Sequence, residues 1–404
     1  MITVQEAENR IAQSLESLPS ETVSIDGALG RVLREPLRAD RDAPPFNRST
    51  FDGIALDYTA IERGQAAFPI AGTAFAGSPQ LELTDSGSCV EIMTGAPLPD
   101  AANCVVKIED LEIESGIAQI NEDVPLSAGY GVHPQGSDCK SGQELLQPGS
   151  RLTAKELSIA ASIGKAELVV ASQPRISIVT TGDELVGVDE TPLPHQIRRS
   201  NDLALQAALV AGGYDRCERF HLRDDRAETE STARSLVDES DVIILAGGVS
   251  KGKRDFLPEA LEAIGVQKEF QWVAQRPGKP LWFGTANSNG RRRYVFALPG
   301  NPVSCFTCLH RYVLPGLDRM SGLTGADSEP IRLQSDFQFK PPLALFLPVR
   351  TSIDRNGQRW AEPLPFNTSG DYISVASTQG FVELPQEQET FASGDVVTFR
   401  PWLT

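Results

Sequence analysis

The sequence predicts a multidomain protein of the α/β plus β class, in which a central α/β domain lies between two β-rich regions. Between residues 174 and 322, short apolar runs alternate with segments of helical periodicity, which is typical of a parallel sheet covered by helices on both faces. Residues 42–150 are rich in Gly, Pro and β-branched side chains, with turn signals at short intervals. Beyond residue 325 the pattern becomes strand-like without a convincing helix, so we expect a small all-β domain there.

The N-terminal region begins with a predicted helix. Residues 3–18 favour a helix, because Thr3 and Glu6 have the spacing of a capping box and apolar residues recur at helical intervals. Short strands and turns are expected at 21–40. A second helix is expected from Thr153 to about Ile163, again with capping-box spacing at its start.

The α/β region contains the most regular pattern. Its predicted strands are 176–181, 216–222, 242–246, 268–274, 281–284 and 293–298. Its predicted helices are 200–210, 227–238, 255–264 and 303–317. The candidate N-caps are Ser200, Asp224 or Asp225, and Asp255. Ligands of such sheets bind at the carboxyl ends of the strands, so we expect the loops at these ends to form one crevice.

Composition excludes several classes of function. The net charge of −17 argues against non-specific binding to nucleic acid and against anionic membrane surfaces. No apolar run approaches the ~18 residues of a membrane span, and the first residues lack the pattern of a signal peptide. Six scattered cysteines are typical of reduced thiols, so we expect a cytoplasmic protein.

Three loops of unusual composition adjoin predicted strands, at 247–255, 276–280 and 299–304. Gly-rich turns between a strand and a helix leave backbone N–H groups free to face an anion. The positive residues beside these turns are Lys251, Lys253, Arg254, Arg276 and Lys279. In an acidic chain, this basic cluster indicates a site for phosphate or another oxyanion.

The first of these loops is close to a P-loop. Gly247, Gly252 and Lys253 have the required spacing, but Arg254 stands where Ser or Thr would hold Mg²⁺. A tight turn without a ligand is a plainer interpretation of the glycines than a nucleotide-hydrolysing P-loop. The basic neighbours favour anion binding over both.

Acidic residues also follow the predicted strands. Each of them taken singly is a cap or a solvated carboxylate more often than a catalytic group. Together they indicate a Mg²⁺ site beside bound phosphates, since Mg²⁺ takes one or two carboxylates plus phosphate oxygens and water. The residues are Asp183, Glu184, Asp224 and Asp255.

One Cys-x-x-Cys pair lies in the last predicted helix of the α/β region. Cys305 and Cys308 have no second pair that would complete a zinc site. Their neighbours are apolar, so we expect two buried helical thiols.

Six stretches of the chain, taken together, resemble one family: the molybdopterin molybdenumtransferases, or MoeA and gephyrin E-domain family. They occur in the family's order and span nearly the whole chain. They are Pro45–Ala55, Ile92–Pro99, Ser177–Leu185, Gly247–Ser250, Arg276–Pro280 and Leu298–Ser304.

The resemblance implies an elongated four-domain subunit that forms a homodimer. A discontinuous, helical N-terminal domain would comprise 1–41 and 139–173 and contribute to dimerisation. A β-rich domain would be inserted at 42–138, and a three-layer α/β domain at 174–322 would bind molybdopterin. A small β-barrel would form residues 323–404.

The reaction implied by the resemblance inserts molybdate into adenylylated molybdopterin and releases AMP. The residues implied as catalytic are Asp52, Thr94, Asp138, Glu184, Asp224 and Asp255. Asp224 and Asp255 would hold Mg²⁺, whereas Asp52 and Thr94 would reach into the partner subunit's site. The implied substrate-binding residues are Gly247, Gly248, Ser250, Arg276, Lys279, Pro299, Gly300, Asn301, Pro302 and Ser304.

Two other functions stay open at the level of the sequence. Residues 133–135, 198–199 and 251–254 differ from those usual in the family. They leave room for a divergent paralogue that binds molybdopterin, or inserts tungstate, without the standard activity. A P-loop-like nucleotide hydrolase is the other alternative.

Overall fold

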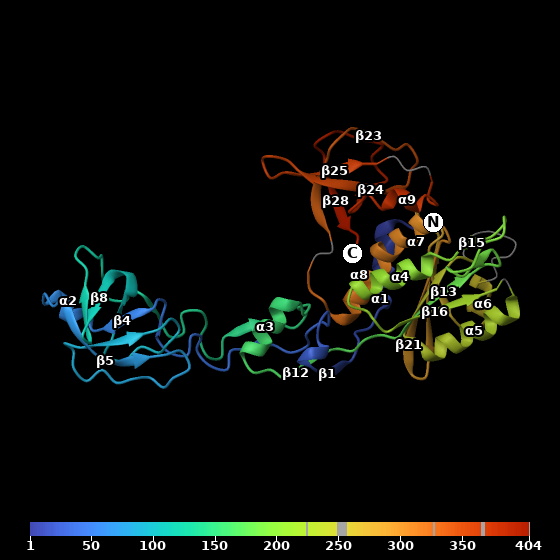
Figure 1. Ribbon diagram of the computed structural model, residues 1–404. Coiled ribbons are helices and arrows are strands. Elements are labelled where there is room, and N and C mark those ends of the chain that lie inside the picture. Colours follow the sequence, from blue (N-terminus) through green and yellow to red (C-terminus); the bar gives the residue numbers. More distant parts are fainter. Residues whose placement is uncertain (224, 249–256, 326–327, 365–367, 404) are drawn as a thin grey trace. The chain divides into compact units, whose positions relative to one another are not determined.

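The computed structural model describes the chain except for residues 224, 249–256, 326–327, 365–367 and 404. The chain divides into two compact units (Figure 1). Unit 1 comprises Met1–Glu35, Pro148–Leu157 and Glu167–Thr404, and unit 2 comprises Pro36–Gln147 and Ser158–Ala166. The four-domain boundaries implied by the resemblance stay a prediction.

A six-stranded sheet forms the centre of unit 1. In spatial order its strands are β16 (Cys217–Leu222), β13 (Ile176–Thr181), β17 (Val242–Ala246), β21 (Arg291–Leu298), β20 (Trp282–Ser288) and β18 (Gln267–Gln271). The first four strands run parallel to one another. The predicted positions of all six strands are confirmed to within a few residues.

The prediction of a parallel sheet is wrong for the last two strands. β20 pairs antiparallel with β21, and β18 pairs antiparallel with β20. The reason is the connection between β20 and β21, which consists of Asn289 and Gly290 alone, both at positive φ (52° and 71°). A two-residue turn of this kind joins only antiparallel strands.

Helices cover both faces of the sheet, so the predicted three-layer arrangement is confirmed (Figure 1). On one face, apolar side chains of the strands pack against α1 (Val4–Ser14), α4 (Asn201–Ala211), α7 (Pro302–Cys308) and α8 (Leu314–Ser321). On the other face, they pack against α5 (Arg226–Glu239) and α6 (Leu257–Ala263). Successive residues of β17 alternate between the two cores, as the strand period of two requires.

The helix termini confirm two of the predicted caps. Of the capping box predicted at Thr153 and Glu156 one half is present, since the Thr153 N–H donates to the Glu156 carboxylate at 3.0 Å. Thr3 and Glu6 form the complete capping box of α1, and the Asp225 carboxylate accepts the Glu228 N–H at 2.8 Å. Ser200 occupies the N-cap of α4, but its side chain makes no capping hydrogen bond, so this cap was wrongly predicted. The expected cap Asp255 lies outside the described residues.

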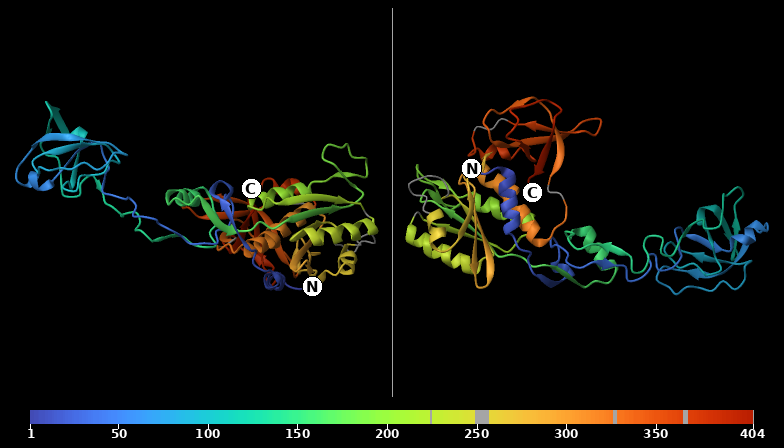
Figure 2. Two further views of the ribbon diagram at one scale, coloured as in Figure 1. Left: turned by 90° about the horizontal axis from the view of Figure 1, so that it is seen from below. Right: turned by 180° about the vertical axis from the view of Figure 1, so that it is seen from behind.

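The C-terminal part of unit 1 is a small β-barrel. Its strands are β22 (Glu329–Leu333), β24 (Ala344–Ile353), β25 (Arg359–Pro363), β26 (Gly380–Leu384) and β28 (Val396–Pro401). The pairing of β24 with β26 closes the ring, which confirms the predicted barrel (Figure 2). One short helix, α9 (Tyr372–Val375), interrupts a region in which no helix was expected.

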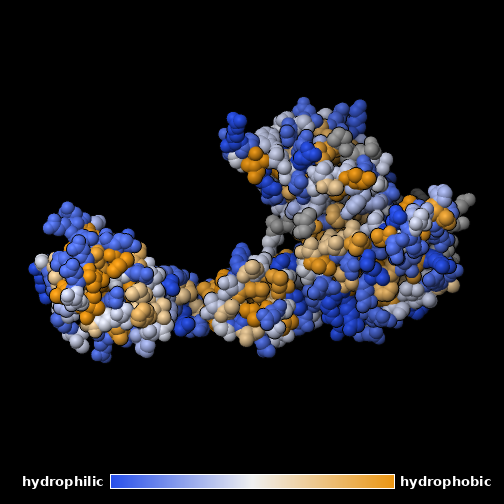
Figure 3. Space-filling model, viewed as in Figure 1, coloured by the Kyte–Doolittle hydropathy of each residue, from blue (hydrophilic) through white to orange (hydrophobic). Residues whose placement is uncertain are grey.

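Unit 2 is rich in strands, as predicted for this part of the chain. Its main sheet has the order β7 (Cys104–Lys107), β4 (Gly53–Leu56), β6 (Cys89–Ile92), β5 (Ala67–Ala74), β9 (Ile117–Ile120) and β8 (Leu111–Glu114). It also contains most of α3 (Ala154–Ser162). Apolar side chains gather on its visible face in Figure 3 among hydrophilic ones. None of the helices among the described residues of either unit combines the length and the apolar character that a membrane crossing requires.

Candidate functional site

A pocket of about 650 Å³ opens at the carboxyl ends of the parallel strands in unit 1. Thr180 and Thr181 line it from the end of β13, and Ala246 lines it from the end of β17. Arg223 follows β16 and Pro299 follows β21, and both line the same pocket. The crevice expected at the strand ends is therefore present.

Gly247 and Gly248 form the wall of the pocket beyond β17, at φ values of 114° and 71°. A Cβ atom on Gly248 would lie 3.2 Å from the Leu257 Cβ and 3.3 Å from the Thr181 Oγ1. The Gly247 N–H is already used, since it donates to the Leu298 carbonyl at 3.0 Å. The pair therefore combines a backbone conformation that favours glycine with close neighbours that a side chain would have to displace slightly.

The loop Pro299–Pro302 forms another wall. Two side-chain hydrogen bonds hold it in place: the Asn201 amide donates to the Gly300 carbonyl, and the Asn301 amide donates to the Ser369 Oγ, each at 2.7 Å. Pro302 is the first residue of α7, where a missing N–H costs nothing. Four of the predicted substrate-binding residues therefore line the pocket on one clamped loop.

Glu184 is the predicted catalytic residue that the structure brings to this pocket. Its carboxylate is exposed, and its backbone carbonyl accepts the Ile197 N–H at 2.8 Å. Gly182 makes room for it, because a Cβ there would lie 2.5 Å from the Glu184 Oε2. The arrangement gives the pocket one exposed carboxyl group.

Arg276, Lys279 and Ser304 do not lie among the described lining residues of the pocket. Arg276 and Lys279 are exposed, whereas Ser304 is buried within α7. The loop that carries the two basic residues is anchored by hydrogen bonds to the side chain of Gln275, which is fully buried. The Gln275 Nε2 donates to the Gly278 carbonyl at 3.0 Å, and the Tyr312 hydroxyl donates to the Gln275 Oε1.

Asp52, Thr94 and Asp138, which the resemblance assigns to catalysis, all belong to unit 2. The Asp52 carboxylate accepts the Thr94 N–H at 2.7 Å and the Thr94 hydroxyl at 2.8 Å. These two hydrogen bonds, the backbone one first, hold the pKa of Asp52 below its usual value. Asp138 lies 2.9 Å from the His133 Nε2, which makes a second exposed polar pair in this unit.

Several predicted site residues lie outside the described part of the chain. They are Asp224, Ser250 and Asp255, with the basic residues Lys251, Lys253 and Arg254. Among the described residues, no group of three or more His, Cys, Asp or Glu side chains is placed to hold a metal ion. The predicted Mg²⁺ ligands therefore stay a prediction.

The prediction of two buried thiols is confirmed. Cys305 and Cys308 are both buried in α7. Burial raises the pKa of Cys308 to about 12 and also raises that of Cys305, so both thiols stay protonated and unsuited to bind metal.

Three arginines and one asparagine that line the pocket were not among the predicted site residues, although positions 198–199 were expected to set this chain apart from its family. Arg198, Arg199 and Asn201 flank the start of α4, and Arg223 follows β16. Their signal in the sequence was their place directly after predicted strands or directly before a predicted helix. This signal identifies pocket residues only when the order of the strands in the sheet is known, because that order decides which strand ends are neighbours.

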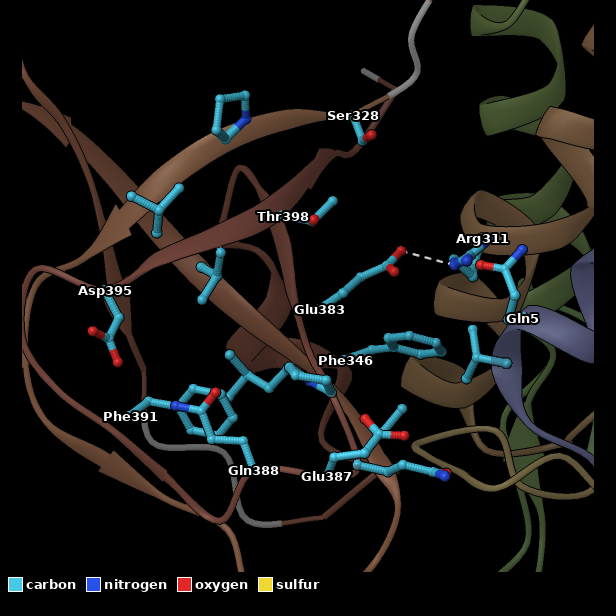
Figure 4. A pocket seen from close by; sticks show the side chains of 18 of the residues that line it. Gln5, Arg311, Ser328, Phe346, Glu383, Glu387, Gln388, Phe391, Asp395 and Thr398 are labelled. Atoms are coloured by element: carbon cyan, nitrogen blue, oxygen red, sulfur yellow. Dashed lines mark ion pairs between the residues drawn. The ribbon is translucent and has the colours of Figure 1, made fainter.

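A larger hollow of about 930 Å³ lies between the barrel and the start of α1 (Figure 4). None of the predicted site residues lines it. Its buried Arg311 lies 2.7 Å from Glu383 and 2.9 Å from Glu8. This ion-pair network joins three elements of unit 1, and we interpret it as structural.

The fold and the pocket define a class: an α/β protein with a ligand pocket at the carboxyl ends of its central strands. Three family models match successive parts of the chain. Residues 2–164 match the MoeA N-terminal region (domain I and II), 177–319 match a probable molybdopterin binding domain, and 330–402 match the MoeA C-terminal region (domain IV). The chain belongs to the MoeA family.

Individual relatives are similar to this chain over nearly their whole length. The chain is 39% identical over 404 residues to a molybdopterin molybdenumtransferase of Synechocystis, covering all of both chains. It is 30% identical over 403 residues to one of Staphylococcus aureus, covering 98% of this chain and 94% of the relative. A solved MoeA structure from Pyrococcus horikosii is similar at a TM-score of 0.76 and 28% identity, covering 100% of this chain and 99% of that one.

Proposed function

We propose that the chain is a transferase of molybdenum cofactor biosynthesis, which inserts molybdate into adenylylated molybdopterin and releases AMP. The observation that carries this proposal is the strand-end pocket. Seven of the residues that the resemblance assigns line it: Glu184, Gly247, Gly248, Pro299, Gly300, Asn301 and Pro302. Full-length relatives named molybdopterin molybdenumtransferase support the same reaction.

The chemistry of the lining suits a pterin linked to a nucleotide through phosphates. The two glycines beyond β17 let the ligand approach the backbone closely. The clamped loop Pro299–Pro302 gives the pocket a fixed wall on which the substrate is oriented. In this proposal Glu184, which lines the pocket, accepts a proton from the water that cleaves the phosphoanhydride.

Magnesium belongs to the proposal as a cofactor. The described lining supplies one carboxylate, that of Glu184, which is compatible with a Mg²⁺ ion that is otherwise bound by phosphates and water. Asp224, which follows the lining residue Arg223 in the sequence, and Asp255 would hold the ion. A bound Mg²⁺ would polarise the phosphoanhydride.

We also propose that the enzyme works as a homodimer in the cytoplasm. In this arrangement Asp52 and Thr94 of one subunit complete the site that holds Glu184 of the other. The exposed position of the Asp52–Thr94 pair on unit 2 supports a role outside its own unit.

Mixed dimers test this arrangement. A dimer of one Asp52→Ala and one Glu184→Ala subunit has one complete site if the two residues act across the dimer. Heterodimers purified through two different tags should then regain about half of wild-type turnover, although both parent homodimers are inactive. Heterodimers as inactive as the parents would contradict the shared site.

The proposed reaction is tested directly by AMP release. Purified protein is incubated with adenylylated molybdopterin and Mg²⁺, with and without molybdate. We expect AMP to appear in the presence of molybdate. Binding without release would favour the divergent paralogue, and hydrolysis of ATP in place of this reaction would favour the P-loop hydrolase.

A further inference from the structure

Three arginines line the strand-end pocket: Arg198, Arg199 and Arg223. Arg198 ends β15 (Ile197–Arg198), and Arg223 directly follows β16. Leu222, the last residue of β16, pairs with Thr181 in the sheet, and the Gly182 N–H donates to the Leu222 carbonyl at 3.3 Å. Arg223 therefore follows β16 at the level where β13 ends and its last residue, Thr181, lines the pocket. We name these three residues the arginine wall.

The backbone beneath the arginine wall is well fixed. The Arg199 N–H donates to the Val186 carbonyl at 3.0 Å, and the Arg198 Nε donates to the Glu190 carbonyl at 3.1 Å. In the described part of the chain, no ion pair joins Arg199 or Arg223 to another residue. Among the described residues, therefore, no carboxylate neutralises these two guanidinium groups.

The local charge opposes that of the whole molecule. Against the three arginines, Glu184 is the one acidic side chain among the described residues that line the pocket. The chain as a whole has a net charge of −17. A positive wall in an acidic protein indicates selection of an anion.

The start of α4 adds a second contribution at the same place. Ser200 and Asn201 line the pocket, and Ser200 leaves its hydroxyl unused for capping. The first N–H groups of an α-helix have no acceptor within the helix and carry its positive partial charge. Asp202, in the first turn of α4, offsets part of this charge, because its buried carboxylate accepts the Leu203 N–H at 3.0 Å and lies 3.9 Å from Arg219 on β16.

We propose that the arginine wall and the start of α4 form a phosphate subsite, which holds the pyrophosphate of the nucleotide half of the substrate, with Arg199 as its central residue. This inference rests on the proposed function. Arginine forks on two elements suit the adjacent phosphates of a pyrophosphate, since each fork binds two oxygens of one anion. A single tetrahedral oxyanion such as molybdate would use only part of the wall.

Direct binding tests the subsite. The probe is ADP, which carries a pyrophosphate, and it is titrated into the full chain by calorimetry, with AMP and molybdate in separate titrations. We expect Arg199→Gln to raise the Kd for ADP about tenfold or more. Arg199→Lys should restore part of the affinity, because it keeps the charge but loses the fork.

The control is Arg355→Gln, an exposed arginine on the turn between β24 and β25 of the barrel. This variant loses the same charge and should bind ADP as the wild type does. Equal Kd values for ADP in Arg199→Gln and wild type, to within about twofold, would overturn the subsite. So would a loss of molybdate affinity in Arg199→Gln with unchanged ADP binding, because the wall would then bind the other oxyanion.

Turnover separates this inference from the proposed function. If the wild type releases AMP with molybdate but Arg199→Gln changes neither KM nor the Kd for ADP, the subsite fails and the function stands. If the wild type releases no AMP but binds ADP through Arg199, the function fails and the subsite stands. If both hold, the KM for adenylylated molybdopterin should rise in Arg199→Gln.

Discussion

Replacing Glu184 by Gln should lower the kcat of molybdate-dependent AMP release by about 10²–10⁴-fold, the range lost when a general acid–base group is removed. Glu184 is the predicted catalytic residue that lines the described pocket, and its carboxylate occupies space that Gly182 leaves open. Gln keeps the shape but cannot accept a proton. Because the side chain is exposed, the fold should be unaffected.

The control for this experiment is Glu218→Gln, which removes an equal charge from an exposed position on β16. It should turn over at the wild-type rate. Circular dichroism and ADP binding show that both variants are folded and bind ligand. A Glu184→Gln enzyme with wild-type kcat would show that this carboxylate takes no part in the chemistry.

Replacing Gly53 by Ala should unfold the main sheet of unit 2. Gly53 lies in β4 between its partners Ile92 and Lys107, and a Cβ there would lie 1.8 Å from the Val106 carbonyl oxygen. Two paired strands cannot separate without breaking their hydrogen bonds, so we expect a loss of about 3 kcal/mol or more in the free energy of unfolding. The neighbouring Asp52–Thr94 pair would be displaced, and turnover would be lost with it.

Hydrogen exchange of peptides from β4 and β7 measures this loss locally. All four tryptophans lie in unit 1, so their fluorescence is an internal control that should not change. Gly72→Ala is the matched variant, because Gly72 lies in the same sheet and its nearest atom would be 3.6 Å from the new Cβ. Wild-type protection of β4 in Gly53→Ala would mean that the sheet absorbs the added methyl group.

Much of the fold could be predicted from local signals. The capping box of Thr3 and Glu6 defines the start of α1, and the apolar runs around Ile176–Thr181 and Val242–Ala246 mark buried strands. These signals depend on residues close in sequence. The direction of β20 was missed, because the apolar run ends several residues before the Asn289–Gly290 turn that determines it.

The site was less predictable, for a physical reason. Gly247 and Pro299 were found because turn residues at strand ends are visible in the sequence. The three arginines were not recognised as one group, since Arg199 follows β15 and Arg223 follows β16, and only the folded chain brings both into the lining of one pocket. The exposure of Arg276 and Lys279 could not be predicted either, because it depends on the conformation of a loop that the buried Gln275 side chain holds in place.

The central claim is that this strand-end pocket performs metal insertion. The most direct measurement is AMP release from adenylylated molybdopterin by the purified wild type at fixed Mg²⁺, with molybdate present or omitted. The account predicts release that requires molybdate and that is lost in Glu184→Gln. Release at the same rate without molybdate, or no release from a protein that binds the substrate, would contradict it.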